Sequence, residues 1–206
     1  MHIKILQFMY GEFEYFTLNE KINRAYCVRH GYEYLIDREK PRTDRHIHWH
    51  KAAVCSTHLL DCDYMLYLDA DAFFYAHELS VEKHCFPLLG DKKILLANDT
   101  AHAALQWNAH LPNTGVILMR NELLTRQMME EWNRSSDDDE EIRSVWPLEQ
   151  LGFWKYIFPK YFDDIEVLQD YYLFGGVCGL YIRHLMLMNS DERTRQMKDY
   201  INTYLH

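Results

Sequence analysis

Apolar residues along the chain group into short unbroken runs separated by polar stretches. Runs of strand length with a strongly apolar centre predict strands of a sheet that is covered on both faces. The predicted strands are residues 3–9, 32–37, 64–68, 93–97 and 116–119.

The segment after the first run has the spacing of a helix. Tyr15, Leu18, Ile22 and Tyr26 lie three or four positions apart, as one buried helix face requires. Gly31 follows this pattern and predicts the end of the helix, since glycine readily adopts the left-handed conformation found there.

Residues 49–60 predict a second helix after a polar loop. The predicted order is therefore strand, helix, strand, helix, strand. That order predicts an α/β fold in which a largely parallel sheet carries helices on both faces. With 206 residues, of which 48% are apolar and 26% charged, the chain has the size and composition of one globular domain.

The formal net charge of −9 bears on the kinds of partner to expect. Nonspecific affinity for nucleic acid or an anionic membrane comes from lysine and arginine neutralising phosphates, so neither is an expected partner. An acidic protein that binds a diphosphate needs a local cation. The charge therefore favours a bound metal if the ligand is a phosphate ester.

The sequence predicts neither a membrane span nor a signal peptide. The longest weakly polar stretch, residues 172–182, is too short for a hydrocarbon core of roughly 30 Å, and Glu12 comes too early for a signal peptide. Five cysteines without a CxxC pair fit a reducing compartment. We expect a cytoplasmic protein, in the host cytoplasm if the source is a virus. Further domains of a larger polypeptide stay open.

Polar residues follow two of the predicted strands and lead into a third. In α/β sheets, ligands bind at the carboxyl ends of the strands, so we expect these residues to share one crevice. They are Asp69 and Asp71, then Asn98 and Asp99, then Asn113 and Gly115.

Asp69 and Asp71 form a DxD pair directly after a predicted strand. Side chains at i and i+2 of an extended segment point the same way, so the two carboxylates can converge, and Ala70 keeps the intervening position small. Such oxygen ligands suit Mg²⁺ or Mn²⁺, whose other positions phosphate oxygens can fill. As a Lewis acid, the ion would stabilise a leaving diphosphate.

A block of charge at residues 135–141, SSDDDEE, has no such context. We interpret it as a solvated loop or the start of a helix, because a run of like charges is usually exposed. We assign it no functional role.

Four segments occur in an order that resembles one class of enzyme. They read YLDADAFFY, LANDT, LPNTGVILMRN and WPLEQLGFW, and they resemble the successive blocks of GT-A nucleotide-sugar glycosyltransferases. The chain most resembles the galactosyl-, mannosyl- and xylosyltransferase family of fungi and plants, and is also similar to a glycosyltransferase domain of a large algal virus (chlorovirus). The likeness spans about residues 3–184.

The resemblance implies a GT-A, Rossmann-like α/β fold with a mixed, mostly parallel sheet flanked by helices in a single domain. It implies metal-dependent transfer of a hexose or deoxyhexose from a UDP-sugar to a glycan acceptor, with retention of anomeric configuration. Mn²⁺ is the expected ion and Mg²⁺ the alternative. Residues 1–100 would mainly bind nucleotide and metal, and residues 101–206 mainly donor sugar and acceptor.

The resemblance also points to the residues that bind the donor. Family members bind the nucleotide with the first strand and the following loop, which here are Gln7, Phe8, Met9 and Tyr10. Tyr10 would stack on uracil, or else is one of the many structural aromatics among 15 tyrosines. Lys51 in WHKAAV matches a basic residue near the donor, or is a surface helix lysine.

A third metal ligand and the sugar contacts follow from the same resemblance. His184 matches the histidine that GT-A enzymes supply to the metal, although a lone histidine is usually structural. Asn98, Asp99 and Asn113 match residues that hydrogen-bond to donor sugar hydroxyls, and Gly115 permits close approach of the backbone to the ligand. The plainer alternative for these residues is a turn.

Asp99, Glu149 and Gln150 are the residues that the resemblance assigns to catalysis. The family usually shows Asp-Gln where this chain has Glu149-Gln150, and Pro147 also predicts a helix start. Retention follows from front-face attack in which the departing diphosphate takes the acceptor's proton. If a nucleophile existed, Glu149 would be the candidate and Gln150 would steady the sugar.

Alternating histidines allow a different metal site. His46, His48 and His50 on an extended segment would place three imidazoles on one side, as zinc binding requires. The helix predicted from Trp49 breaks this alternation, so the zinc site is the less favoured hypothesis.

Two other classes of function stay open. An apolar strand followed by DxD also fits a phosphohydrolase of the haloacid dehalogenase type, with Asp163 and Asp164 as its later acidic motif, although Phe73 stands where those enzymes have Thr or Val. A nucleotide-sugar-binding module without turnover fits as well. Release of phosphate from a phosphomonoester would indicate the hydrolase, and release of UDP the transferase.

Overall fold

The computed structural model describes residues 1–99, 111–169 and 173–205. The strands are β1 (Ile3–Phe8), β2 (Glu33–Asp37), β3 (Tyr64–Leu68), β4 (Ala72–Phe74), β5 (Ile94–Asn98), β6 (Pro112–Arg120), β7 (Ile165–Leu168), β8 (Phe174–Gly176) and β9 (Ile182–His184). The α-helices are α1 (Glu14–His30), α2 (His50–His58), α3 (Val81–His84), α4 (Phe86–Leu89), α5 (Leu123–Asp138), α6 (Glu149–Gly152) and α7 (Ser190–Tyr204).

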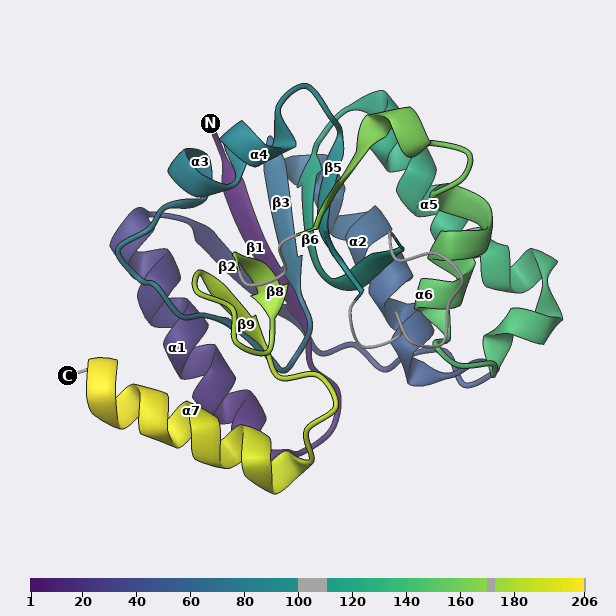
Figure 1. Cartoon of the computed structure of the whole chain (residues 1–206). Helices are drawn as coiled ribbons and strands as arrows, with labels where there is room; N and C mark the ends of the chain where they lie inside the picture. Colours follow the sequence, from purple (N-terminus) through teal and green to yellow (C-terminus); the bar gives the residue numbers. More distant parts are fainter. Residues whose placement is uncertain (100–110, 170–172, 206) are drawn as a thin grey trace.

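Within these residues, six strands form the central sheet in the order β2-β1-β3-β6-β5-β7 (Figure 1). β1 is parallel to β2 and β3, and β5 is parallel to β7. β6 is antiparallel to both of its neighbours, β3 and β5. The predicted α/β fold with a mixed, mostly parallel sheet is confirmed. The apolar run of β6 could not reveal its direction, because a buried strand looks alike in either orientation.

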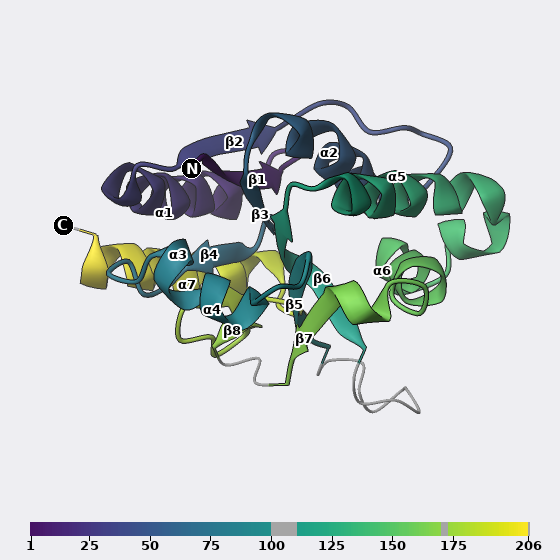
Figure 2. The ribbon, with the colours of Figure 1, turned by 90° about the horizontal axis from the view of Figure 1, so that it is seen from above.

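Helices cover both faces of this sheet (Figure 2). α2, α5 and α6 lie on one face, and α1, α3, α4 and α7 lie on the other, together with a small second sheet. Successive side chains of β3 point to opposite faces of the sheet, as in any β-strand. Met65 and Tyr67 pack in the core that contains Trp132 of α5, whereas Leu66 and Leu68 pack in the core on the opposite face.

The second sheet has the strand order β4-β9-β8. β4 follows the DxD pair almost at once, and it is antiparallel to β9, with Ala72 opposite His184. This pairing was not predicted, since strands of three residues leave little pattern in a sequence. It carries His184 to the carboxyl end of β3.

The two predicted helices are present. The first ends at Gly31, whose φ of 73° is the left-handed conformation that favours glycine. The second begins one residue later than predicted and is flanked by 3₁₀ turns at Ile47–Trp49 and Leu59–Asp61.

The prediction of a solvated loop or helix start at residues 135–141 fits the acidic side chains of the segment but not its two serines. Asp137, Asp138, Glu140 and Glu141 are exposed, and a 3₁₀ turn begins at Glu140. α5 continues to Asp138, and Ser135 and Ser136 are buried at its end. Arg45 binds the Ser136 hydroxyl and the Asp137 carboxylate. The burial of these serines could not be predicted from the acidic run, because a run of charge predicts exposure only for the charged side chains themselves.

α7 was missed although its start has a sequence signal. Asn189 and Glu192 form a capping box in which each side chain accepts a hydrogen bond from the other residue's backbone. An Asn-x-x-Glu pattern before apolar residues at helical spacing is typical of a helix N-terminus. The buried residues of α7 are Met197, Tyr200 and Ile201.

Among the described residues, no helix has both the length and the apolar character needed to cross a membrane.

Candidate active site

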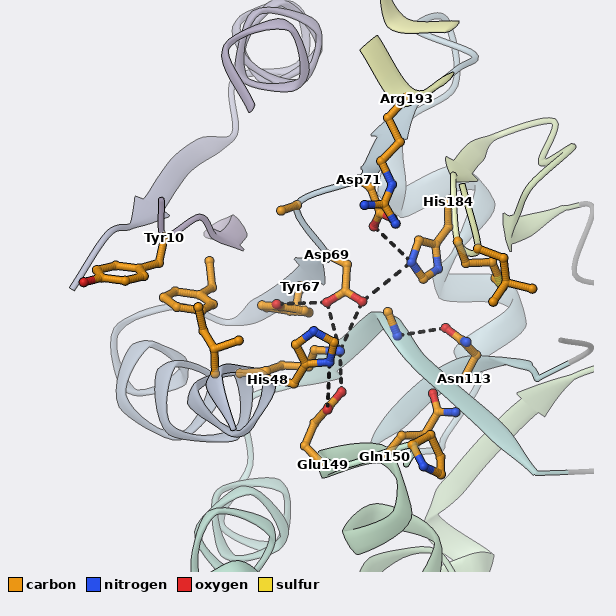
Figure 3. Close-up of a pocket in the computed structure, with 18 of the residues that line it drawn as sticks. Tyr10, His48, Tyr67, Asp69, Asp71, Asn113, Glu149, Gln150, His184 and Arg193 are labelled. Atoms are coloured by element: carbon orange, nitrogen blue, oxygen red, sulfur yellow. Dashed lines mark hydrogen bonds and ion pairs between the residues drawn. The ribbon is translucent and has the colours of Figure 1, made fainter. Parts of the chain in front are cut away.

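A cavity of about 440 Å³ opens beside the carboxyl end of β3. Its floor carries Asp69 and Asp71, and one wall carries Glu149 and Gln150 of α6 (Figure 3). His184 lines the cavity as the last residue of β9. Segments far apart in the sequence therefore supply one polar site.

Asp69 and Asp71 flank a tight turn between β3 and β4. The N–H of Asp69 donates to the carbonyl of Gly115 at 2.7 Å, and the N–H of Ala72 donates to the carbonyl of Asp69 at 2.8 Å. The buried amide of Gln7 donates to the carbonyls of Asp69 and Ala72 at 3.0 and 3.2 Å. These bonds fix the backbone and with it the direction of both carboxylates.

Asp69, Asp71 and His184 form a cluster whose ligand atoms all lie within 4.8 Å of one another. Nε2 of His184 is 3.2 Å from Oδ1 of Asp71 and 3.6 Å from Oδ2 of Asp69. Nδ1 of His184 is buried and has no hydrogen-bond partner within residues 1–99, 111–169 and 173–205. Among the described residues, no other group of three or more histidine, cysteine or acidic side chains lies close enough together to hold a metal ion.

The charges in this cluster support one another. Burial lowers the pKa of His184, but the carboxylates of Asp71 and Asp69 outweigh it and raise the pKa. Burial raises the pKa of Asp71, but His184 and Arg193 outweigh it and lower the pKa. Two carboxylates and one imidazole are a donor set that fits a divalent transition-metal ion better than Mg²⁺, which prefers oxygen ligands.

Gly115 is required by the closeness of His184. A β-carbon at this position would lie 2.0 Å from Cε1 and 2.6 Å from Nδ1 of the imidazole, and 2.9 Å from Oδ2 of Asp69. Real β-carbons do not approach heavy atoms this closely. The glycine therefore makes room for a side chain of the cluster.

Lys51 is a buried cation between two carboxylates. Its Nζ is 2.9 Å from Oδ1 of Asp69 and 2.8 Å from Oε1 of Glu149, and it donates to the carbonyl of Thr114 at 3.2 Å. Burial lowers the pKa of Lys51, but Asp69 and Glu149 raise it by more. The alternative of a surface lysine is wrong, because only 5% of the residue is exposed.

Glu149 presents one oxygen to Lys51 and keeps the other within the site. Oε2 is buried and makes no hydrogen bond with the part of the chain that the structure describes, and Nδ1 of His48 is 3.7 Å away. Nε1 of Trp132 donates to the Glu149 carbonyl at 2.8 Å and fixes the start of α6. That helix begins at Glu149 itself, two residues after Pro147, so Pro147 is not its first residue.

Gln150 connects the cavity wall to Asp99. Its Oε1 accepts from the N–H of Thr114 at 2.8 Å, and its Nε2 donates to Oδ2 of Asp99. Asp99 is buried and does not line the cavity, and Asn98 does not line it either. Asn113 does line it, while its Oδ1 accepts from the N–H of Gly115 at 2.8 Å.

The four predicted nucleotide residues and Ala70, between the two aspartates, divide into two groups. Phe8, Tyr10 and Ala70 line the cavity, and Tyr10 is 38% exposed. Gln7 and Met9 are buried and do not line it. Gln7 and Phe8 are successive residues of β1, so their side chains face opposite ways, and only Phe8 reaches the cavity.

The three alternating histidines do not converge. The side chain of His46 accepts from the N–H of His48 at the start of a 3₁₀ turn. His48 lines the cavity, whereas His50 packs against Phe8 with ring centroids 4.5 Å apart. The hypothesis of a zinc site at these residues is therefore not supported.

Asp163 and Asp164 lie in a 3₁₀ turn before β7 and do not line the cavity. In a hydrolase of the haloacid dehalogenase type, the later acidic motif must share the site with the DxD. That reading of the two residues is wrong for this fold.

Several residues of the site left no signal in the sequence. Tyr67 donates its hydroxyl to Oδ1 of Asp69 at 3.1 Å. Thr114 joins Glu149 and Gln150 through its hydroxyl, at 3.3 Å from an oxygen of each. Arg193 pairs with Asp71. A tyrosine within an apolar strand and an arginine in a helix are too common to be singled out.

The sequence model of the galactosyl transferase GMA12/MNN10 family matches residues 10–151 of this chain. No curated protein sequence matches the chain. Among solved structures, a glycosyltransferase involved in the glycosylation of the major capsid of PBCV-1 is similar. It is 16% identical, with a TM-score of 0.76 and coverage of 97% of this chain and 100% of that chain.

Two further structures are similar in fold. The galactosyltransferase LgtC in complex with donor and acceptor sugar analogs has a TM-score of 0.55 at 12% identity, with 95% of each chain covered. A Drosophila galactosyltransferase in complex with manganese, UDP-Gal and xylobiose has a TM-score of 0.54 at 16% identity, covering 94% of this chain and 74% of that one. At such identities, the likeness shows the shared GT-A fold alone.

Proposed function

This chain belongs to the galactosyl transferase GMA12/MNN10 family of glycosyltransferases, and we propose that it moves a hexose or deoxyhexose from a UDP-sugar to a glycan acceptor. The transfer depends on a divalent cation, Mn²⁺ before Mg²⁺, and retains the anomeric configuration. The observation that carries the proposal is the cluster of Asp69, Asp71 and His184 on the floor of the cavity.

In this proposal, Asp69, Asp71 and His184 hold the cation, and the donor diphosphate completes its coordination. The ion supplies Lewis-acid stabilisation of the charge that develops on the leaving diphosphate. A bound manganese and UDP-Gal occur together in one enzyme of similar fold.

The rest of the donor would lie along the cavity from Tyr10 to Asn113. Tyr10 would stack on uracil, and its partial exposure in the lining of the cavity supports this role. Asn113 and Glu149 offer polar atoms for sugar hydroxyls, and the buried Oε2 of Glu149 accepts no hydrogen bond from the described residues. A sugar hydroxyl donating to this oxygen would satisfy it.

We propose that Glu149 and Gln150 bind and orient the sugar rather than form a covalent intermediate. Lys51 neutralises Glu149 at 2.8 Å, which weakens it as a nucleophile. The amide of Gln150 is held on both sides, by Thr114 and by Asp99. Asp99 would therefore act through Gln150, as a positioning residue. The acceptor's proton passes to the departing diphosphate.

The acceptor would enter over an apolar rim. Trp146 is 57% exposed and Leu187 75% exposed, and both line the cavity. Exposed apolar side chains at the mouth of a polar cavity suit the apolar face of a sugar ring, while the floor satisfies hydroxyls.

The test is UDP release from a panel of UDP-sugars with Mn²⁺, with Mg²⁺ and with chelator. We expect release that requires metal and that is lost in Asp71→Asn. Asp91→Asn, an exposed acid outside the cavity, is the matched control and should behave as wild type. Metal-independent release would contradict the proposed role of the cluster.

A binding module without turnover is the second candidate, since the same cavity could bind a nucleotide-sugar without transferring it. Calorimetry with UDP and Mn²⁺ separates the two. Binding together with transfer, or with slow donor hydrolysis, supports the enzyme. Binding with neither, for every donor in the panel, supports the module.

A location in the cytoplasm stays a prediction that imaging of the tagged protein would test.

A further inference from the structure

Arg193 lies in the first turn of α7 and contacts a residue of the proposed cation site (Figure 3). Its Nη2 is 2.7 Å from Oδ2 of Asp71, and its Nε donates to the carbonyl of Leu185 at 3.3 Å. The guanidinium carbon is 5.4 Å from the centroid of the Tyr15 ring. Arg193 lines the cavity, so its charge faces both Asp71 and whatever ligand enters.

The packing of α7 against α1 positions this arginine. Met197 of α7 lies one turn further along the same helix face and packs with Tyr15 and Phe16 of α1 in a buried cluster. The N–H of Leu185 donates to the carbonyl of Asp71 at 3.0 Å. These contacts join α7, the residue after β9 and the turn that contains Asp71. The Arg193 side chain is therefore held by several neighbours.

The two oxygens of Asp71 have different partners. Oδ1 faces His184 at 3.2 Å, and Oδ2 faces Arg193 at 2.7 Å. A divalent ion that binds Asp71 must therefore share the carboxylate with a fixed positive charge. Because Asp71 is buried, this repulsion is only weakly screened by solvent.

With a diphosphate in the cavity, the positive charge of Arg193 would favour binding of the cation and the diphosphate together instead of opposing the cation. A guanidinium carries five N–H donors in a planar fork, so it can hold a carboxylate oxygen and a phosphate oxygen together. Lys51, the other cation at the acidic pair, is already bonded to two carboxylates and a carbonyl. Arg193 is therefore the better placed of the two to bind an anion that enters the cavity.

We propose that Arg193 makes cation binding depend on the donor diphosphate. This inference rests on the function proposed above. Without a donor, the guanidinium neutralises Asp71 and opposes the divalent ion. When the diphosphate enters, Arg193 binds it as well as Asp71, and the negative charge of the phosphate offsets the positive charge of the guanidinium. Asp71 can then bind the cation, and the two ligands strengthen each other's binding. By linkage, the diphosphate must gain as much affinity from the cation as the cation gains from it.

The experiment measures Mn²⁺ binding by calorimetry and by the electron paramagnetic resonance of free Mn²⁺, with and without saturating UDP. The variants are Arg193→Met, which keeps an unbranched apolar stem, and Arg193→Lys, which keeps the charge. Arg195→Met is the matched control on the same helix, where Arg195 faces solvent and pairs with Asp199. Thermal unfolding shows that each variant is folded.

We expect UDP to raise the Mn²⁺ affinity of the wild type by about 5- to 150-fold, the usual range for coupled sites. Arg193→Met should bind Mn²⁺ alone more tightly than the wild type. UDP should raise its Mn²⁺ affinity by a smaller factor than in the wild type, because only the direct coordination of the diphosphate to the ion remains. Arg193→Lys should keep part of the coupling, and Arg195→Met all of it.

Two results would overturn the inference while leaving the proposed function intact. Weaker Mn²⁺ binding by Arg193→Met, to the same degree with and without UDP, would mean that Arg193 only holds Asp71 in place. Unchanged binding would mean that it has no part in the site. If the wild type binds neither Mn²⁺ nor UDP, the proposed function fails and the inference with it.

Discussion

The imidazole of His184 occupies the space that a β-carbon on residue 115 would need, because such an atom would lie 2.0 Å from Cε1 of the histidine. Gly115 and His184 come from different sheets, and each limits what the other can be. The proposed cation site therefore depends on a residue with no side chain.

Gly115→Ala should displace His184 and weaken Mn²⁺ binding by about 10- to 100-fold, the range seen when the support of a metal ligand is lost. Gly31→Ala is the control. Gly31 has a φ of 73° and nothing within 4 Å of an added β-carbon, so its substitution strains the end of α1 without touching the cavity. Calorimetric titration with Mn²⁺ distinguishes the two variants, and equal affinities would show that His184 is not a ligand.

Lys51→Met should destabilise the protein by about 3–5 kcal/mol, because it leaves Asp69 and Glu149 without the buried cation they share. Urea denaturation at pH 7 measures this. Adding Glu149→Gln should restore part of the stability, since it removes one of the two unpaired charges. Lys21→Met, at an exposed position of α1, should change stability little. No recovery in the double variant would contradict the electrostatic explanation.

His77 should make the protein less stable on the acidic side of neutrality. Burial is the main cause that lowers the pKa of His77 from its ordinary 6.5 to about 4, and the positive charge of Arg29 is the second. Between these values, the unfolded chain binds a proton that the native state does not, so stability falls as pH drops from about 6.5 to about 4. His77→Gln should remove about 1–2 kcal/mol of this dependence, after allowing for partial exposure of the side chain.

Urea denaturation of His77→Gln at a series of pH values tests this prediction. His84→Gln, at an exposed position, is the control. If the stability profile of His77→Gln is as steep as that of the wild type, another group is responsible for the acid sensitivity.

Trp146→Ala should raise the KM for the glycan acceptor by about tenfold, and it should leave UDP release in the absence of acceptor nearly unchanged, because loss of one aromatic contact costs about 1–2 kcal/mol. Phe162 is similarly exposed but lies outside the cavity, so Phe162→Ala is the matched control. Initial rates at varied acceptor concentration measure the effect. A change in the donor KM instead would place Trp146 on the donor side.

The sequence by itself determined the features that depend on local spacing. Buried strands produce apolar runs, so β1, β3 and β5 could be predicted, and so could the position of Asp69 and Asp71 at the end of β3. The end of α1 at Gly31 followed from the conformational freedom of glycine. The order of the family's motifs then indicated the fold and the class of enzyme.

Only the tertiary structure decided which residues meet. His184 reaches the acidic pair because β9 is antiparallel to β4, and Arg193 reaches Asp71 because α7 packs on α1. Gln7 turned out to hold the backbone of the acidic turn rather than face the cavity. Long-range pairing and the direction in which a side chain points depend on contacts between distant segments, and spacing along the chain carries no record of them.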